Sequence, residues 1–204
     1  DQFYESGVKV QEFNSWGGGG IAGIDMNSDN MASGAVNTRL NGSLTLANAN
    51  KLTYYTDIRN VNFFLNNLNF KDTNAAAYKQ CVGEAYYFRA WFYFNLFKNY
   101  GNIAWLDHTL APDENEMNLP QEGRIAMVDH ILSDLDKAID LLSLQNSAAT
   151  MRVHKDVARA FKSEVALYEA TWEKYHQAKN DAFYDKTVTA AKIKDYLEQC
   201  VAAC

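Results

Sequence analysis

From about residue 51 to the end of the chain, apolar side chains recur every three or four positions, and this periodicity restricts the fold more than any other feature. A repeat of about 3.6 residues aligns such side chains along one face of an α-helix. The only two prolines are Pro112 and Pro120, so long uninterrupted helices can form. The pattern predicts five helices, at about residues 52–68, 75–100, 121–142, 155–175 and from about 187 onward.

The succession of these helices predicts a mostly all-α protein. Helices of roughly 20 residues, joined by short or moderate loops and carrying aromatic and alanine side chains along their faces, are typical of stacked helical hairpins. This is a tetratricopeptide-like architecture, although the generic repeat signature is degenerate and gives no repeat count. We therefore expect a helical domain over residues 51–204.

Residues 1–50 have a different character. They contain a run of glycines at positions 17–20, many asparagines and serines, and few charges. Such a composition predicts loops and short turns. We expect a separate, irregular N-terminal segment that could face a ligand.

The two ends of the sequence suggest a piece of a longer protein. The chain begins with Asp1 and not with methionine, which is typical of a processed or excised product. The last predicted helix keeps its apolar stripe up to Cys204, with no closing glycine. We expect the natural protein to continue past this residue, so that the helical domain is truncated at its C-terminal end.

Composition and motif content argue against several classes of function. The formal net charge is −6, with both signs interspersed, so there is no basic track for nucleic acid. No apolar run approaches the roughly 18 residues that a membrane span requires. The histidines are widely spaced, no H-E-x-x-H motif occurs, and no serine or cysteine has the context of a nucleophile. We expect a binding protein that is not an enzyme and holds no metal or cofactor.

Trp16 is the first candidate for ligand contact. A sugar can lay its apolar C–H face on an aromatic ring while nearby amides and carboxylates bind its hydroxyls. The glycines that follow Trp16 would let a ligand approach the backbone closely. The alternative is that this side chain packs the N-terminal segment onto the helices.

Asp25, Asn27 and Asp29 form a second candidate group. Their spacing is that of the first ligands of a calcium loop, but the sixth position is Asn30 and the twelfth is Val36, so the segment is not an EF-hand. These side chains either bond their local backbone in a turn or contact a surface ion or sugar hydroxyls.

Trp105 and His108 form a third candidate pair. They follow the Gly101 turn in a stretch without helical periodicity. Side chains on such a loop can face a ligand, but these two could equally fix the loop to the helix ends.

Four segments, in this order and at these separations, carry a more specific pattern. They are YYTDIRNVNFFL at residues 54–65, GEAYYFRAWFYFNLFKNYG at 83–101, MVDHILSDLDKAIDLL at 127–142 and VARAFKSEVALYEATWEKYH at 157–176. Together they resemble the SusD/RagB family of outer-membrane nutrient-binding lipoproteins. The resemblance covers about residues 25–204, and the second segment is its most specific part.

The resemblance implies a fold, a location and a partner. Members of this family have tetratricopeptide-like helices and irregular loops that make the ligand site. A lipidated N-terminal cysteine anchors them on the surface of Gram-negative bacteria, where they cover a SusC-like TonB-dependent transporter and deliver oligosaccharides, or in some members peptides. This chain lacks the lipidated cysteine and the second half of a member, and Ala104 replaces the usual proline after the Y-G turn.

The shared polar residues of the pattern are expected to be structural. Glu84 and Arg89 are five positions apart on one helix, too far round for an ideal pair, so each should bond a neighbouring helix or a loop backbone. Asp134 and Asp136 should orient a loop or lie in solvent.

We therefore expect a surface protein that captures oligosaccharides for an outer-membrane transporter. The alternatives are a peptide-binding member of the same family, or a helical protein-interaction scaffold with no small ligand.

Overall fold

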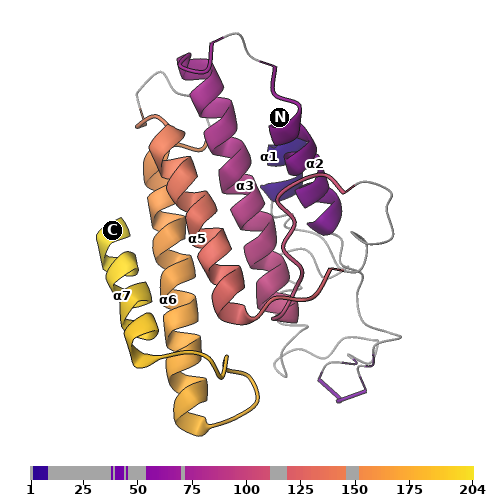
Figure 1. Ribbon diagram of the computed structural model, residues 1–204, viewed down its shortest axis with the longest axis vertical. Coiled ribbons are helices and arrows are strands. Elements are labelled where there is room, and N and C mark those ends of the chain that lie inside the picture. Colours follow the sequence, from indigo (N-terminus) through magenta and orange to yellow (C-terminus); the bar gives the residue numbers. More distant parts are fainter. Residues whose placement is uncertain are drawn as a thin grey trace, which may run out of the picture. The chain divides into compact units, whose positions relative to one another are not determined.

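The computed structural model describes residues 2–8, 38, 40–43, 45, 54–69, 72–110, 119–145 and 152–204. Within these residues there are six helices and no strand, which confirms the predicted all-α class (Figure 1). The chain divides into two compact units, Asp1–Leu52 and Thr53–Cys204. The first contains α1 (Gln2–Gly7), and the second contains α2 (Tyr54–Asn66), α3 (Ala76–Tyr100), α5 (Arg124–Leu141), α6 (Lys155–Lys179) and α7 (Ala190–Ala203).

Local capping explains where the helices end. Gly101 ends α3 with a positive φ of 72°, and its N–H donates to the carbonyl of Phe97. Helix α6 continues to Lys179, beyond the predicted end, because Asn180 supplies a left-handed cap with φ of 52°. The last helix begins later than predicted, because Thr189 is its N-cap and its hydroxyl accepts the N–H of Lys192.

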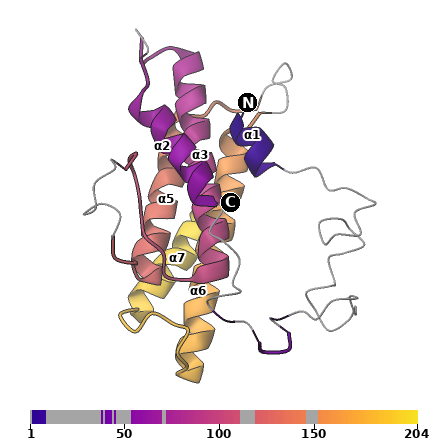
Figure 2. The ribbon, with the colours of Figure 1, turned by 90° about the vertical axis from the view of Figure 1, so that its right-hand side faces the viewer.

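The five helices of the second unit pack in the order in which they occur along the chain. Helix α2 lies against α3, α3 against α5, α5 against α6, and α6 against α7. Consecutive helices of α3, α5, α6 and α7 run in opposite directions, as helical hairpins do (Figures 1 and 2). None of the helices within the described ranges has both the length and the apolar character to cross a membrane.

Helix α3 is the centre of this unit. Its buried side chains point in all directions around the helix axis, because it has neighbours on several sides. The ring of Phe161 on α6 lies 5.6 Å from Tyr87 and 5.6 Å from Phe94, measured between ring centroids. Each fully buried side chain of this kind contributes about 1.5–3 kcal/mol relative to an exposed one. The largest in α3 are Phe88, Phe92, Tyr93, Phe94, Leu96 and Phe97.

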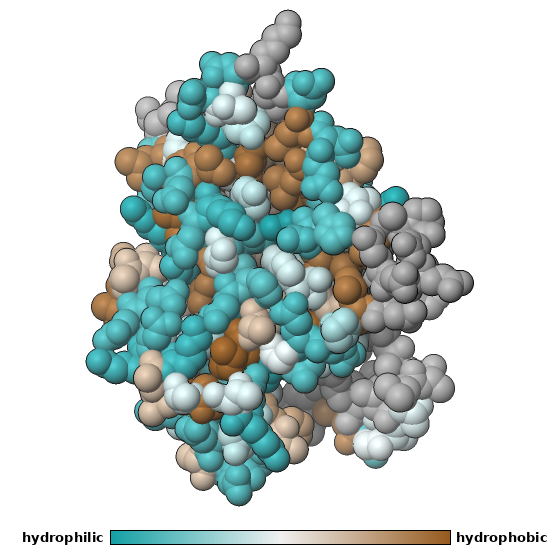
Figure 3. Space-filling model, in the orientation of Figure 1, coloured by the Kyte–Doolittle hydropathy of each residue, from teal (hydrophilic) through white to brown (hydrophobic). Residues whose placement is uncertain are grey.

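The face of the molecule in Figure 3 is mainly hydrophilic where its residues are described. Figure 3 shows hydrophilic side chains over most of the face that carries α5 and α7, with apolar side chains in scattered patches. The most exposed aromatic side chains of the described residues are those of Phe183, at 63% exposure, and Tyr175, at 61%. Single exposed apolar side chains are normal on a folded protein.

Gly83 allows α3 to approach the end of α5, and Gly83→Ala is expected to lower the free energy of unfolding by about 1–2 kcal/mol. A Cβ at this position would lie 2.9 Å from Cγ of Leu142 and 3.2 Å from Cβ of Leu141. The first distance is shorter than carbon atoms allow and the second is tight, so Leu142 and the end of α5 would have to shift. Urea denaturation followed by circular dichroism measures the loss.

In the double variant Gly83→Ala, Leu142→Ala the two losses should be less than additive, because alanine lacks the Cγ and Cδ2 atoms of Leu142, which would lie 2.9 and 3.0 Å from the added Cβ. An alanine variant as stable as the wild type would contradict the prediction. Alanine is otherwise favoured over glycine in a helix by about 1 kcal/mol.

Candidate functional site

Residues 101–110, which connect α3 to the segment before α5, are held in place by side chains of the helices. The hydroxyl of Tyr55 donates to the carbonyl of Ala104 at 2.9 Å, and the amide of Asn62 donates to the carbonyl of Leu106 at 2.8 Å. The hydroxyl of Tyr93 accepts the N–H of Leu106 at 2.7 Å. Burial raises the pKa of Tyr93, so this hydroxyl also remains a donor. The loop therefore has a defined course.

A buried ion pair supports the same loop. The guanidinium of Arg89 bonds both carboxylate oxygens of Asp134, at 2.6 and 2.8 Å. Its remaining nitrogen donates to Asn62 at 2.9 Å and to the carbonyl of Asp107 at 3.1 Å. Arg89 is thus bound to two neighbouring helices and to the loop backbone, as predicted.

The charged partner of Glu84 is also outside its own helix, although Gln80 on α3 donates a further hydrogen bond to the same carboxylate at 2.8 Å. Its carboxylate bonds the guanidinium of Arg152, in the segment before α6. Asp134 is completely buried and does not lie in solvent, because its position on α5 faces α3. Asp136, two residues further on, lies on the outer side of α5 and pairs with Lys162.

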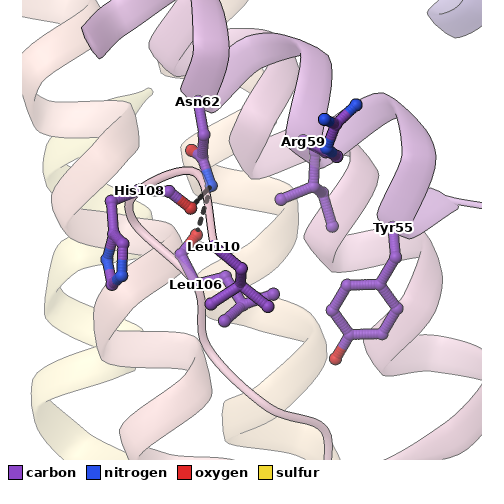
Figure 4. Close-up of a pocket in the computed structure, with 7 residues that line it drawn as sticks. Tyr55, Arg59, Asn62, Leu106, His108 and Leu110 are labelled. Carbon is purple, nitrogen blue, oxygen red and sulfur yellow. Dashed lines mark hydrogen bonds between the residues drawn. The ribbon is translucent and has the colours of Figure 1, made fainter. Parts of the chain in front are cut away.

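One pocket lies between α2 and the loop and is called the α2 pocket below. It has a volume of about 260 Å³ and mostly apolar walls. Figure 4 shows the amide of Asn62 directed at the carbonyls of Leu106 and His108, which close one side of it. The residues that line it are Tyr55, Ile58, Arg59, Asn62, Leu106, His108 and Leu110.

A second pocket, called the α5 pocket below, lies between the loop, α3 and α5. Its volume is about 410 Å³, and its lining is mostly polar. Trp105 enters it from the loop, with the ring of Tyr93 at 4.3 Å and the ring of His130 at 4.6 Å from its own. The residues that line it are Leu65, Asn66, Tyr86, Arg89, Trp105, Asp107, Glu122, His130, Ser133, Asp134 and Lys137.

Two of the predicted ligand contacts, His108 and Trp105, lie within the described residues, and they line different pockets. His108 lines the α2 pocket, where its Nδ1 lies 2.8 Å from a carboxylate oxygen of Asp107. Trp105 lines the α5 pocket. Their contact with a ligand stays a prediction. Trp16, Asp25, Asn27 and Asp29 lie outside the described residues.

The sequence analysis did not propose the other polar residues of the α5 pocket as ligand contacts, since it expected Arg89 and Asp134 to be structural. Four of these residues lie on one face of α5, because they occupy positions i, i+3, i+4 and i+7 of the helix. They are His130, Ser133, Asp134 and Lys137. This polar stripe, on a helix whose other face is apolar, is the signal that could have revealed them. Among the described residues no group of histidine, cysteine, aspartate or glutamate side chains could hold a metal ion.

Stacked helical hairpins with pockets beside a loop that side chains hold in place define the class as tetratricopeptide-like helical proteins. The particular family follows from comparison with known proteins. The SusD-like family, described as starch-binding and associating with the outer membrane, matches residues 7–167, and the chain belongs to this family. No curated protein matches the chain significantly.

Solved structures agree with this assignment. A SusD-like protein from Bacteroides fragilis NCTC 9343 is 31% identical over 61% of this chain and 24% of its own, with a TM-score of 0.53. A laminarin binding SusD-like protein is 25% identical over 61% of this chain and 27% of its own, with a TM-score of 0.52.

A third structure, a SusD-like carbohydrate binding protein from Bacteroides fragilis NCTC 9343, shows the extent of the shared fold. It covers 88% of this chain with a TM-score of 0.66, although only 22% of the residues are identical. The chain spans 37% of that protein's length, and about a quarter of the length of the other two.

Proposed function

We propose that this protein captures oligosaccharides at the cell surface and passes them to a SusC-like TonB-dependent transporter in the outer membrane. The observation that carries the proposal is the match of residues 7–167 to a starch-binding family that associates with the outer membrane. The likeness to a laminarin binding protein supports a glycan as the ligand.

The chemistry of the loop region is compatible with glycan capture. Sugar rings need aromatic or aliphatic surface for their C–H faces, and donors and acceptors for their hydroxyls. The loop at residues 101–110 borders pockets that offer both kinds of surface. Capture for later transfer requires no bond chemistry, so the proposal assigns no catalytic residue.

Binding of neutral oligosaccharides tests the proposal directly. Isothermal titration calorimetry of this chain with laminarihexaose, maltoheptaose and a xyloglucan heptasaccharide should give saturable binding to at least one, with a dissociation constant between about 1 μM and 1 mM. An oligopeptide mixture should not bind. Binding of peptides alone would support the peptide-binding alternative, and binding of neither would support a scaffold without a small ligand.

Trp16→Ala should weaken the binding of that oligosaccharide about threefold to tenfold, because an aromatic contact contributes about 0.5–1.5 kcal/mol. The matched control is Tyr175→Ala, which removes an aromatic side chain that is 61% exposed on α6. Equal affinities of Trp16→Ala and Tyr175→Ala for the oligosaccharide would show that Trp16 does not contact the ligand.

A further inference from the structure

The floor of the α5 pocket is a buried ion pair whose guanidinium is already fully hydrogen-bonded. The guanidinium of Arg89 uses its nitrogens on Asp134, Asn62 and the carbonyl of Asp107. Because both members of the ion pair are buried, they shape the pocket and have little capacity left for a ligand. A volume of about 410 Å³ is within the range of about 300–1,000 Å³ that is typical of small-ligand sites.

The charges of the lining restrict the class of ligand. Arg89 and Lys137 are positive, whereas Asp107, Glu122 and Asp134 are negative. The ammonium group of Lys137 lies 3.5 Å from Asp134, so the positive charges face carboxylates of the pocket itself. Because Arg89 and Asp134 pair with each other, the other charges of the lining are one ammonium group and the two carboxylates of Asp107 and Glu122, which give an anionic ligand no net attraction. A neutral ligand is the best match.

The rim has the partners that hydroxyl groups require. The carboxylates of Asp107 and Glu122 accept hydrogen bonds, the ammonium group of Lys137 donates them, and the hydroxyl of Ser133 does both. These groups are accessible: the side chains of Lys137 and Glu122 are 49% and 33% exposed. Donors and acceptors in one small hollow can bond several hydroxyls of one ring.

The apolar contact in this pocket comes from Tyr86. The rings of Tyr93 and His130 both lie nearly parallel to that of Trp105, at interplanar angles of 30° and 9°. The guanidinium carbon of Arg89 also lies 5.3 Å from the centroid of Trp105, so the indole already contacts three neighbouring side chains. The ring of Tyr86 is half-buried in the wall, and the ammonium group of Lys137 and the guanidinium carbon of Arg89 lie 5.1 and 5.3 Å from its centroid. The C–H face of a sugar reaches this ring by displacing the exposed Lys137 side chain.

From these observations we infer that the α5 pocket binds one pyranose residue of a neutral oligosaccharide, with Tyr86 as the apolar contact and Glu122, Ser133 and Lys137 as hydroxyl partners. The inference rests on the proposed function, since it assigns a site to the captured glycan.

A bulky side chain introduced at the rim of the α5 pocket should block the binding of a sugar residue there. Ser133 lines the pocket and is exposed on α5, so Ser133→Trp places a large side chain in the hollow without displacing a buried group. Titration uses whichever of laminarihexaose, maltoheptaose and the xyloglucan heptasaccharide binds the wild type most tightly. The variant should weaken that binding at least tenfold. The control Asp140→Trp, which adds the same side chain to an exposed position of α5 outside the pocket, should stay within twofold of the wild type.

A second, smaller substitution tests the same pocket in case Ser133→Trp does not fold. Lys137→Met removes one exposed donor and should weaken binding about threefold to tenfold. Unchanged affinity in both pocket variants, with normal binding by the wild type, would overturn the pocket assignment and leave the proposed function intact. Tighter binding of an oligogalacturonate than of any neutral oligosaccharide would overturn the ligand class. No glycan binding by the wild type would instead overturn the proposed function itself.

Discussion

Asp134→Ala is expected to lower the free energy of unfolding by about 3–5 kcal/mol, the usual cost of removing one partner of a buried ion pair. The substitution leaves the guanidinium of Arg89 buried without a carboxylate, in a region where Arg89 is only 3% exposed. The same guanidinium holds the carbonyl of Asp107, so the loop at residues 101–110 should loosen as well. Urea denaturation monitored by circular dichroism measures the loss.

Two further variants separate the buried pair from the exposed contact beside it. Lys137→Met removes the other cation near Asp134, but the Lys137 side chain is 49% exposed, so the loss should stay below about 1 kcal/mol. The double variant Arg89→Met, Asp134→Leu should recover only part of the stability, because apolar side chains can replace the ion pair but leave Asn62 and the carbonyl of Asp107 without their donor. A loss below 1 kcal/mol for Asp134→Ala would show that water reaches the guanidinium.

The free energy of unfolding is also expected to fall on the order of 3 kcal/mol between pH 5 and pH 9, because of one buried carboxyl group on α6. Burial, together with the negative charge of Glu173, raises the pKa of Glu169 to about 8. The folded protein therefore holds a proton that the unfolded chain has already released above its ordinary pKa of 4.5. This stabilisation is complete at acidic pH and is lost as the pH rises through about 8.

The geometry around Arg124 explains why this carboxyl retains its proton. The guanidinium of Arg124 bonds Glu169 at 2.7 Å and lies 3.7 Å from Glu173, so one cation serves two buried carboxyl groups. The rings of Phe97 and Trp172, at 4.1 and 4.4 Å from its central carbon, exclude water from this site. Burial also raises the pKa of Glu173, although it accepts the backbone N–H of Asp185.

Glu169→Gln tests this explanation. Glutamine resembles the protonated carboxyl group, so the variant should match the wild type near pH 5 and lose much less stability by pH 9. Chemical denaturation at a series of pH values gives both curves. Glu164→Gln, on the same helix but outside this cluster, is the control and should keep the wild-type pH profile. The same slope for Glu169→Gln and the wild type would contradict the assignment of the proton.

The helices could be predicted from the sequence because their signals are local. The apolar repeat locates the start of α3 within one residue of the observed start, and Gly101 marks the end of the helix. Both boundaries depend only on residues within one or two helical turns along the chain. The start of α7 could not be located in this way. The carboxylate of Asp185 bonds the N–H and the hydroxyl of Thr187, and this turn delays the helix to Ala190.

The role of Arg89 was only half determined by the sequence. Its distance from Glu84 along the helix excluded an ideal pair within α3, which correctly predicted partners elsewhere. The choice of Asp134 as the partner depends on which face of α5 lies against α3. No local pattern specifies that choice, because the two residues are 45 positions apart.

The composition of the candidate site likewise could not be predicted from local patterns in the sequence. Sequence reasoning placed Trp105 and His108 on a loop after α3, and the structure shows that they line different pockets. The sequence by itself determined the helices, their class and the family to which they belong, because periodicity and motif spacing are properties of the chain. Only the tertiary structure decided that Tyr86, Glu122 and Ser133 surround one hollow, because packing brings together side chains from separate segments of the chain.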